Sequence, residues 1–232
     1  MRPWLERLGL PWLSRPGLNG IDRRLAELLP QRRGWFVEAG ANDGFEQSNT
    51  YYLERFRGWR GVLVEPEPRL AAACRQRRPK SQVVECALGA PDMAGKTVRL
   101  RCAGLMTTVC GALGSETSER QRAAQGLAIQ GLPVEERIIQ APVRTLTEVL
   151  EESDAPAEFD LLSIDVEGCE VEVLKGLDLR RHRPKAICLE VRAVHLAEVG
   201  QMLESYYEMK EVLHEGEQHG DYFWLRRAGT NF

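Results

Sequence analysis

Short apolar runs alternate with segments of helical periodicity along most of the chain, and this order indicates an α/β fold. The uninterrupted apolar runs are typical of strands buried on both faces, and they cover residues 35–38, 61–65, 82–88, 159–166 and 186–191. Apolar residues at helical spacing predict helices over residues 21–29, 48–56, 66–77, 146–152, 169–177 and 194–209. Strands and helices in this alternation predict a mainly parallel sheet covered on both faces.

The two ends of the chain depart from this alternation. Residues 211–214 and 222–226 have the composition of strands and flank Gly216 and Gly220, which predicts an antiparallel hairpin at the C-terminus. Residues 1–33 contain a single predicted helix. We therefore expect an N-terminal helical extension over residues 1–33, followed by the main domain over residues 34–232.

The middle of the chain is less regular. Strands are predicted over residues 97–102 and 138–143 and a helix over 119–130, whereas residues 105–118 are rich in Gly, Thr and Ser and have no clear period. Long irregular segments are commonly lids or binding loops. We therefore expect residues 103–135 to form an insertion that contacts the substrate or covers it.

Composition and charge narrow the class of protein. A net charge of -3 excludes a polycation built for nucleic acid, so no nucleic-acid partner is predicted. No apolar run is long enough to cross a bilayer. The arginine-rich first 33 residues favour a solvated basic surface and leave a peripheral membrane contact open. The six cysteines form no C-x-x-C pair, which argues against structural zinc and predicts a reducing, cytoplasmic location.

The loop after the first strand carries the first candidate for chemistry. Glu38, Gly40, Asn42 and Gly44 form the pattern Glu-x-Gly-x-Asn-x-Gly. Glycines allow a sharp turn and a close approach to a ligand, and such loops hold nucleotide-like cofactors in open α/β sheets. A nicotinamide-dependent oxidoreductase is a rival interpretation. Its motif is Gly-x-Gly-x-x-Gly, and here Asn42 and Phe45 stand in place of the second and third glycines.

Two strand ends carry carboxylates suited to a nucleoside ligand. Glu65 ends the second buried strand, where a carboxylate can accept hydrogen bonds from two ribose hydroxyls. The alternative is a helix N-terminal carboxylate ahead of Pro66 that the helix dipole favours. Glu38 has a structural interpretation as well, as a brace that accepts backbone N–H groups of the loop. Asn42 and Asp43 can likewise be explained as residues that shape the turn.

Asp165 and Glu167 form the second candidate motif, followed by Gly168, at the end of the strand 159–166. Two carboxylates in one crevice can bind a cation, share a proton or act as a base, or they can simply cap the following helix. Glu190 on the next strand could complete a three-carboxylate site for a divalent cation. The pattern does not favour such a site, so we assign no metal ligands. His195 at a helix start is more commonly structural than catalytic.

Several ordered motifs extend this pattern from about residue 34 to residue 192. They are the loop 38–44, Glu65-Pro66-Glu67-Pro68, Ala87-Leu88-Gly89, the run from Phe159 to Gly168, Glu170, Val173-Leu174-Lys175-Gly176, Pro184 and Glu190. In this combination the chain resembles FkbM-type S-adenosylmethionine-dependent methyltransferases. Glu38 departs from the aspartate often found at its position in that family.

The resemblance implies a fold and a reaction. The fold is a class I methyltransferase, a Rossmann-like three-layer sandwich whose seven-stranded, mainly parallel sheet ends in the C-terminal antiparallel hairpin. The reaction is transfer of a methyl group from S-adenosylmethionine, usually to an oxygen of a sugar, a glycan or a small secondary metabolite. A non-catalytic subunit that keeps the cofactor fold is the alternative, and the retained carboxylates argue against it.

The resemblance also assigns site residues. The loop 38–44 would wrap the methionine end of the cofactor, Glu65 would hold the ribose, and Cys86 and Ala87 would flank the adenine. The full set expected at the cofactor is Glu38, Gly40, Ala41, Asn42, Asp43, Gly44, Glu65, Pro66, Cys86, Ala87 and Asp165. The candidates for removing a proton from the acceptor are Asp165, Glu167, Glu190 and His195. The identity of the acceptor and the oligomeric state are left open by the sequence.

Overall fold

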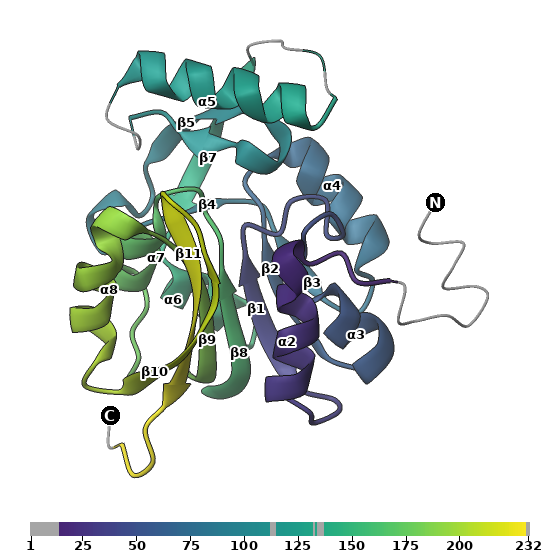
Figure 1. Ribbon diagram of the computed structural model, residues 1–232, viewed down its shortest axis with the longest axis vertical. Coiled ribbons are helices and arrows are strands. Elements are labelled where there is room, and N and C mark those ends of the chain that lie inside the picture. The colour runs from purple at the N-terminus through teal and green to yellow at the C-terminus, as the bar shows by residue number, and fades with distance from the viewer. Residues whose placement is uncertain (1–13, 112–114, 132, 134–136, 231–232) are drawn as a thin grey trace.

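A seven-stranded sheet forms the centre of the computed structural model, which describes residues 14–111, 115–131, 133 and 137–230 (Figure 1). The strand order is β10-β11-β9-β8-β1-β2-β3. The strands are β1 (Trp35–Ala39), β2 (Arg60–Val64), β3 (Gln82–Val84), β8 (Glu158–Ile164), β9 (Arg183–Arg192), β10 (Tyr207–Glu215) and β11 (His219–Arg226). Neighbouring strands from β3 to β9 pair in parallel, whereas β11 pairs antiparallel with both β9 and β10. The predicted fold class is confirmed.

Helices cover both faces of this sheet, because successive strand residues point to opposite sides. Val37 and Leu162 belong to a core shared with α6 (Leu146–Glu152), α7 (Glu170–Lys175) and α8 (Leu196–Leu203). Phe36 and Leu161 belong to a second core on the other face. That core includes residues of α2 (Ile21–Leu28), α3 (Tyr51–Arg57) and α4 (Pro68–Arg77). The three layers thereby bring the carboxyl ends of the parallel strands to one edge.

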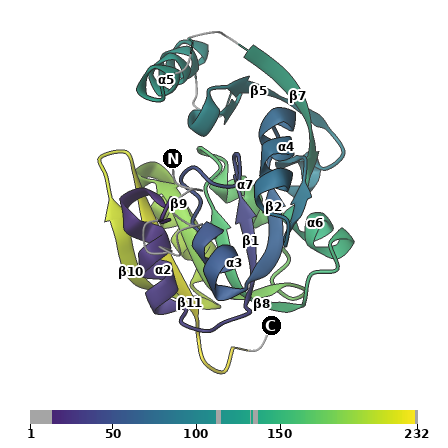
Figure 2. The same cartoon turned by 90° about the vertical axis from the view of Figure 1, so that its right-hand side faces the viewer.

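A smaller sheet lies above this edge and was not foreseen as a separate sheet. Its order is β4-β7-β5-β6, formed by β4 (Ala87–Leu88), β5 (Thr97–Cys102), β6 (Thr108–Val109) and β7 (Arg137–Arg144). The helix α5 (Glu116–Ile129) covers it at the top of the molecule (Figures 1 and 2). Short 3-10 helices, η3 (Pro91–Met93) and η4 (Gly104–Met106), join the strands.

The single strand predicted over residues 82–88 is wrong. β3 ends at Val84, and β4 pairs with β7 in the smaller sheet instead of continuing beside β2. Exposed Glu85, which pairs with Arg75, separates the two strands. Half-buried Val83 and Val84 before Glu85 and buried Cys86, Ala87 and Leu88 after it made the segment look like one apolar run.

The helix predicted over residues 194–209 is also too long. A 3-10 turn, η5 (Ala193–His195), precedes α8, which ends at Leu203. Tyr207 already belongs to β10, where it is fully buried and donates its hydroxyl to the carbonyl of Pro184 at 2.8 Å. The helical spacing of apolar residues continued by coincidence up to the start of β10, a largely exposed edge strand in which only Tyr207 is buried.

The helix α2 packs into the core of the sheet domain. Ile21, Leu25 and Ala26 are buried in the same cluster as Phe36 and Trp59. The adjoining 3-10 turn η2 (Leu18–Gly20) leads into the helix. Residues 1–13 of the predicted N-terminal extension lie outside the described residues, and the boundary at residue 33 stays a prediction.

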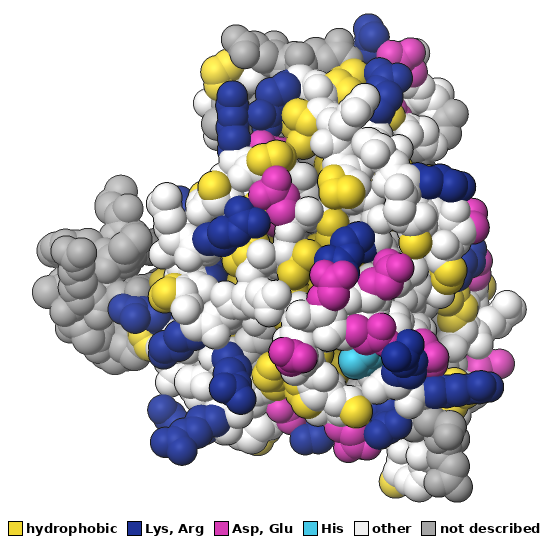
Figure 3. Space-filling view, turned by 180° about the vertical axis from the view of Figure 1, so that it is seen from behind, with side chains coloured by type: hydrophobic (Ala, Val, Ile, Leu, Met, Phe, Trp, Pro, Cys, Tyr) yellow, Lys and Arg dark blue, Asp and Glu magenta, His cyan; other side chains and the backbone are white. Residues whose placement is uncertain are grey.

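An ion pair links α2 to the hairpin, and basic and acidic side chains are interspersed on the surface. Arg24 of α2 binds Glu211 of β10 at 2.7 Å. Figure 3 shows Lys and Arg side chains interspersed with Asp and Glu on the rear face. Among the described residues, no helix is both long and apolar enough to cross a membrane.

We expect Leu25→Ala to lower the free energy of unfolding by about 2–5 kcal/mol, because it removes a fully buried side chain and leaves a cavity. The matched control is Leu18→Ala, since Leu18 is 47% exposed and should change stability by about 0.5 kcal/mol or less. Urea unfolding of both variants measures the difference. Equal stabilities would show that α2 contributes nothing to the core.

Candidate active site

Two adjoining hollows open at the carboxyl ends of β1, β2 and β8. The larger, of about 620 Å³ including its open part, is lined by Glu65, Cys86 and Ala87 among others. The smaller, of about 420 Å³, is lined by Glu38 and residues 46–49 among others. The residues that line both hollows are Gly40, Asn42, Leu105 and Asp165, so the two spaces meet there.

The glycines of the loop 38–44 allow it to pack closely against the end of β8 and against α4. Gly40 has φ 84°, and a Cβ there would lie 1.7 Å from the carbonyl oxygen of Asp165. Gly44 has φ 79°, and a Cβ would meet the side chains of Arg78 and Cys74 at 2.8 Å. Any other residue would push the loop away from β8 or α4. Gly40 also lines both hollows, whereas Gly44 lines neither.

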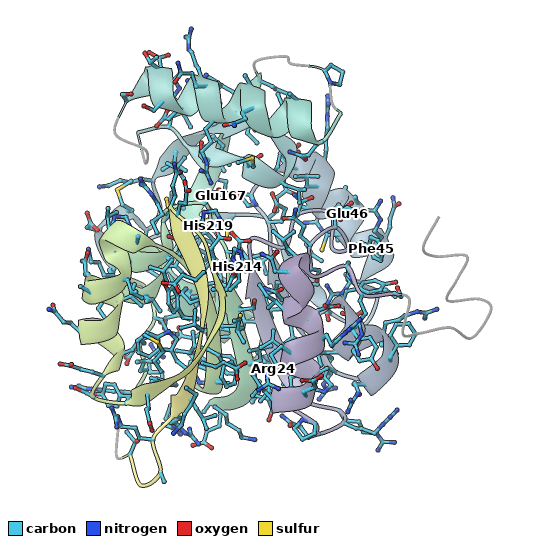
Figure 4. All side chains as sticks on the ribbon, viewed as in Figure 1. Arg24, Phe45, Glu46, Glu167, His214 and His219 are labelled. Carbon is cyan, nitrogen blue, oxygen red and sulfur yellow. The ribbon has the colours of Figure 1, made fainter. Side chains whose placement is uncertain are left out.

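Polar side chains complete this turn. Asn42 has φ 49°, and its Oδ1 accepts the N–H of Asp43 at 2.6 Å. The carboxylate of Asp43 accepts the N–H groups of Phe45 and Glu46 and pairs with Arg77. Figure 4 labels Phe45 and Glu46 on this side of the molecule. Asp43 therefore shapes the turn, which is the structural role considered for it above. A contact between Asp43 and a cofactor stays a prediction.

Glu38 is a buried brace, only 5% exposed. Its carboxylate accepts the hydroxyls of Ser48 at 2.9 Å and Thr50 at 2.6 Å and the N–H of Asn49 at 2.8 Å. These bonds fix the segment 48–50 at the rim of the smaller hollow. Glu38 thus positions the groups that line the hollow, in agreement with the second role considered for it.

Arg78 neutralises the carboxylate of Glu38, a role that the sequence pattern does not indicate. The side chain is 1% exposed and donates to Glu54 at 2.9 Å, to Glu38 at 3.3 Å and to Thr50 at 2.8 Å. Arg78 follows several arginines at the end of α4, where a solvated side chain is the usual expectation. Only the three-dimensional packing of α4 against the loop reveals its partners.

Glu65 lies in the larger hollow, only 5% exposed. One carboxylate oxygen accepts the N–H of Asn42 at 2.9 Å and the other accepts that of Glu67 at 2.8 Å. A carboxylate offers about four acceptor positions, so two remain for a ligand. Burial raises the pKa of Glu65 to about 7, although the two backbone N–H groups oppose the shift.

The other wall of this hollow is apolar. Cys86 and Ala87 line it beside Pro66, and burial raises the pKa of the Cys86 thiol to about 12, which keeps it uncharged. A flat apolar wall and a carboxylate thus share one hollow.

Asp165 stands where the hollows meet and is surrounded by other carboxylates. Its Oδ1 is buried and has no hydrogen-bond partner among the described residues. Burial raises the pKa of Asp165 well above its usual value, and Glu190 and Glu167 raise it further. Glu167, at φ 55°, lines the larger hollow and accepts a bond from Arg122 of α5 at 2.6 Å. The structure therefore brings Asp165 and Glu167 to one site.

The hairpin adds charged groups that the sequence analysis missed. Asp221 of β11 is 6% exposed and lies opposite Glu190 in the sheet register. His214 approaches Asp221 at 3.5 Å and His219 approaches Glu190 at 3.9 Å. Figure 4 labels His219 and His214 on the upper part of the hairpin. An aspartate within an apolar strand was the available signal.

Glu190 and His195 lie outside the residues that line the two hollows. Glu190 nevertheless belongs to the acidic group, since burial and the neighbouring Glu167 raise its pKa to about 8. His195 lies in η5, and its Nδ1 is buried without a hydrogen-bond partner among the described residues. A catalytic role for either residue stays a prediction. No group of His, Cys, Asp and Glu suited to a metal ion occurs in the described part of the chain.

The seven-stranded, mainly parallel sheet with its C-terminal antiparallel hairpin is the arrangement expected of a class I methyltransferase. The family model "Methyltransferase FkbM domain" matches residues 38–223. The chain therefore belongs to the FkbM methyltransferase family, which confirms the predicted family and enzyme class. S-adenosylmethionine, the predicted cofactor, is the methyl donor of this class.

Solved structures with a similar fold span nearly the whole chain. A TehB-like SAM-dependent methyltransferase from Corynebacterium glutamicum has 11% identity and a TM-score of 0.46, covering 97% of each chain. A precorrin-6y C5,15-methyltransferase from Geobacter metallireducens has 13% identity and a TM-score of 0.49, covering 90% of this chain and 88% of that one. No curated protein matches the sequence.

We expect Arg78→Met to destabilise the protein by about 3–5 kcal/mol, because it leaves Glu38 and Glu54 buried without their charge partner. Arg75→Met is the matched control, since that side chain is 46% exposed and its pair with Glu85 is worth about 0–1 kcal/mol. Denaturant unfolding compares the two variants. If both cost the same, the buried network does not hold the loop.

Proposed function

We propose that this chain transfers a methyl group from S-adenosylmethionine to a hydroxyl oxygen of a sugar, a glycan or a small secondary metabolite. The observation that carries the proposal is the junction of the two hollows at Asp165. One hollow has the carboxylate and apolar wall that suit a nucleoside, and the other has the polar rim that suits an amino acid. S-adenosylmethionine has these two parts joined through a positively charged sulfur.

The residues fit this cofactor chemically. Glu65 has acceptor positions left for two ribose hydroxyls, and the neutral Cys86 and Ala87 suit the face of adenine. Asp165 offers a buried oxygen without a partner among the described residues, which suits a neighbouring positive charge. When bound, S-adenosylmethionine supplies a methyl group that its charged sulfur has already activated.

The chain contributes alignment and proton removal. Holding the acceptor oxygen in line with the methyl group can lower the barrier by about 7–11 kcal/mol in ideal cases. A hydroxyl must also lose its proton, and a positioned base contributes about 10²–10⁴-fold. Asp165 is the first candidate for that base, followed by Glu167 and Glu190, because all three belong to the acidic group at this edge. His195 is the last candidate.

The acceptor would enter beneath α5. This helix belongs to the segment 103–135 that we assign to substrate contact, and Arg122 links it directly to Glu167. Residues 112–114, 132 and 134–136 of that segment lie outside the described residues. A small-molecule or glycan acceptor, rather than nucleic acid, agrees with the net charge of -3. The free state of all six cysteines supports a reducing, cytoplasmic location.

We expect Glu65→Ala to weaken S-adenosylmethionine binding by about 100-fold or more, because two charge-assisted hydrogen bonds to the ribose are lost. The matched control is Glu85→Ala, an exposed glutamate just past the end of β3, which should leave the affinity unchanged. Calorimetry measures both, and circular dichroism checks that each variant is folded. An unaltered affinity in a folded Glu65→Ala protein would refute the ribose assignment.

We expect Asp165→Asn to reduce methyl transfer by about 100-fold or more, because the amide cannot take a proton from the acceptor. Transfer of labelled methyl groups into an acceptor-containing cell extract measures this loss. Asp92→Asn, at an exposed position in η3, serves as the control and should retain full transfer. Full transfer by the Asp165 variant would assign the base role to another residue.

The acceptor itself can be found by mass spectrometry of glycans and small molecules from cells with and without the protein. The proposal predicts a species heavier by one methyl group only where the protein is present, carried on oxygen. A methyl group found on nitrogen or on nucleic acid would overturn the proposed acceptor class while leaving the cofactor assignment standing.

A further inference from the structure

We propose that the acidic group around Asp165 and Glu190 distinguishes S-adenosylmethionine from its demethylated product by charge, so that the cofactor binds with release of a proton and the product does not. This inference rests on the proposed function, since it concerns the same hollows. It adds a role for residues of the hairpin that no part of the cofactor needs to touch. It also explains how a used cofactor could leave a site that still fits nearly all of its atoms.

The geometry locates the charge difference. The sulfur of the cofactor joins the nucleoside to the amino-acid part, and the two hollows that suit these parts meet at Asp165. Methyl transfer converts a positively charged sulfur into a neutral one and leaves every other charged group of the ligand unchanged. Asp165 is therefore the side chain best placed to respond to the only charge that differs between the two ligands.

The charged groups that act most strongly on Asp165 are all carboxylates. They lie on four neighbouring segments: Glu167 in the loop after β8, Glu170 in α7, Glu190 in β9 and Asp221 in β11. The end of β1 and Gly40 also pack against Asp165 through the backbone. The basic side chains nearby contact other members of the group: Arg122 binds Glu167, and His214 and His219 lie 3.5 and 3.9 Å from Asp221 and Glu190.

Two buried carboxylate oxygens of the acidic group have no hydrogen-bond donor among the described residues. Asp165 Oδ1 has no hydrogen-bond partner among the described residues. Glu170 is 1% exposed; its Oε1 accepts the N–H of Gly168 at 2.8 Å, but its Oε2 has no partner in the described part of the chain. A buried ionised carboxylate without a donor or a cation is costly. In the free protein such groups hold protons, and a bound cation replaces them.

The direction of the pH effect follows from this arrangement. Burial and neighbouring carboxylates raise the pKa of Asp165 well above its usual value and that of Glu190 to about 8, so the group as a whole holds a proton near neutral pH in the free protein. A positive charge beside them lowers these pKa values, and the proton leaves. The affinity for S-adenosylmethionine therefore rises with pH up to about 8, by at most about tenfold per pH unit for each proton released.

The product controls for every other titration. S-adenosylhomocysteine has the same ribose, adenine, amino and carboxyl groups, so Glu65 and the amino group of the ligand contribute equally to both affinities. The ratio of the two affinities isolates the sulfur charge. We expect this ratio to favour the cofactor at least about tenfold more at pH 8 than at pH 6, if one proton is linked to binding.

Isothermal titration calorimetry of the full chain tests this without an acceptor. Both ligands are titrated at pH 6, 7 and 8 in buffers of different ionisation enthalpy, which gives the number of protons released. If one titrating group is linked to the sulfur charge, we expect about one proton released with S-adenosylmethionine and fewer than about 0.2 with S-adenosylhomocysteine. Equal release with both ligands, or a ratio independent of pH, would overturn the inference. Binding of neither ligand would instead reject the proposed function.

Glu190→Gln tests the acidic group directly. We expect less proton release with S-adenosylmethionine, a shallower pH dependence, and product affinity within about twofold of the parent chain. Glu217→Gln, an exposed glutamate in the turn between β10 and β11, should behave like the parent. Retained product binding shows that the variant is folded; if it is lost, Asp165→Asn replaces it. A folded variant with unchanged proton release would contradict the role of the group.

Discussion

The gathering of carboxylates at one edge of the sheet is the constraint on which the rest of the site depends. The sheet order places β8, β9 and β11 side by side, so the carboxylates near their ends lie close together. These are Asp165, Glu167, Glu190 and Asp221. Such a group is unfavourable by itself, because like charges in a buried place repel one another. It is stable when its members hold protons or face cations.

The two halves of the site solve this problem differently. Around Glu38 the protein supplies its own cation, Arg78, and fills the remaining acceptor positions with Ser48, Asn49 and Thr50. Around Asp165 the buried oxygen has no such partner in the described part of the chain, and α5 contributes Arg122 only to the neighbouring Glu167. We propose that this half holds protons in the free protein and faces the positively charged sulfur of the cofactor when the cofactor is bound.

The sequence predicted the parts of the molecule that local patterns control. Buried strands with helices between them set the central sheet, and the hairpin around Gly216 and Gly220 was recognised from its turn. The separate sheet of β4, β5, β6 and β7 was missed, because β4 pairs with a strand more than fifty residues away, and neighbouring residues do not encode such pairing.

The candidate site follows the same division. Glu65 and Asp165 were recognised because each ends an apolar run, and the structure puts both on the wall of one hollow. Arg78 and the two histidines were missed, since each looks ordinary among its neighbours in the chain. Asp221 was missed although an aspartate within an apolar strand is a usable signal. Their roles arise from contacts between elements, 40 residues apart for Glu38 and Arg78.

The most direct test of the account is a crystal structure of the chain with S-adenosylhomocysteine. The account predicts adenine against Cys86 and Ala87, ribose hydroxyls on Glu65, the amino-acid end beside residues 46–49, and the sulfur next to Asp165. A ligand bound outside the two hollows, or one whose sulfur lies far from Asp165, would contradict it.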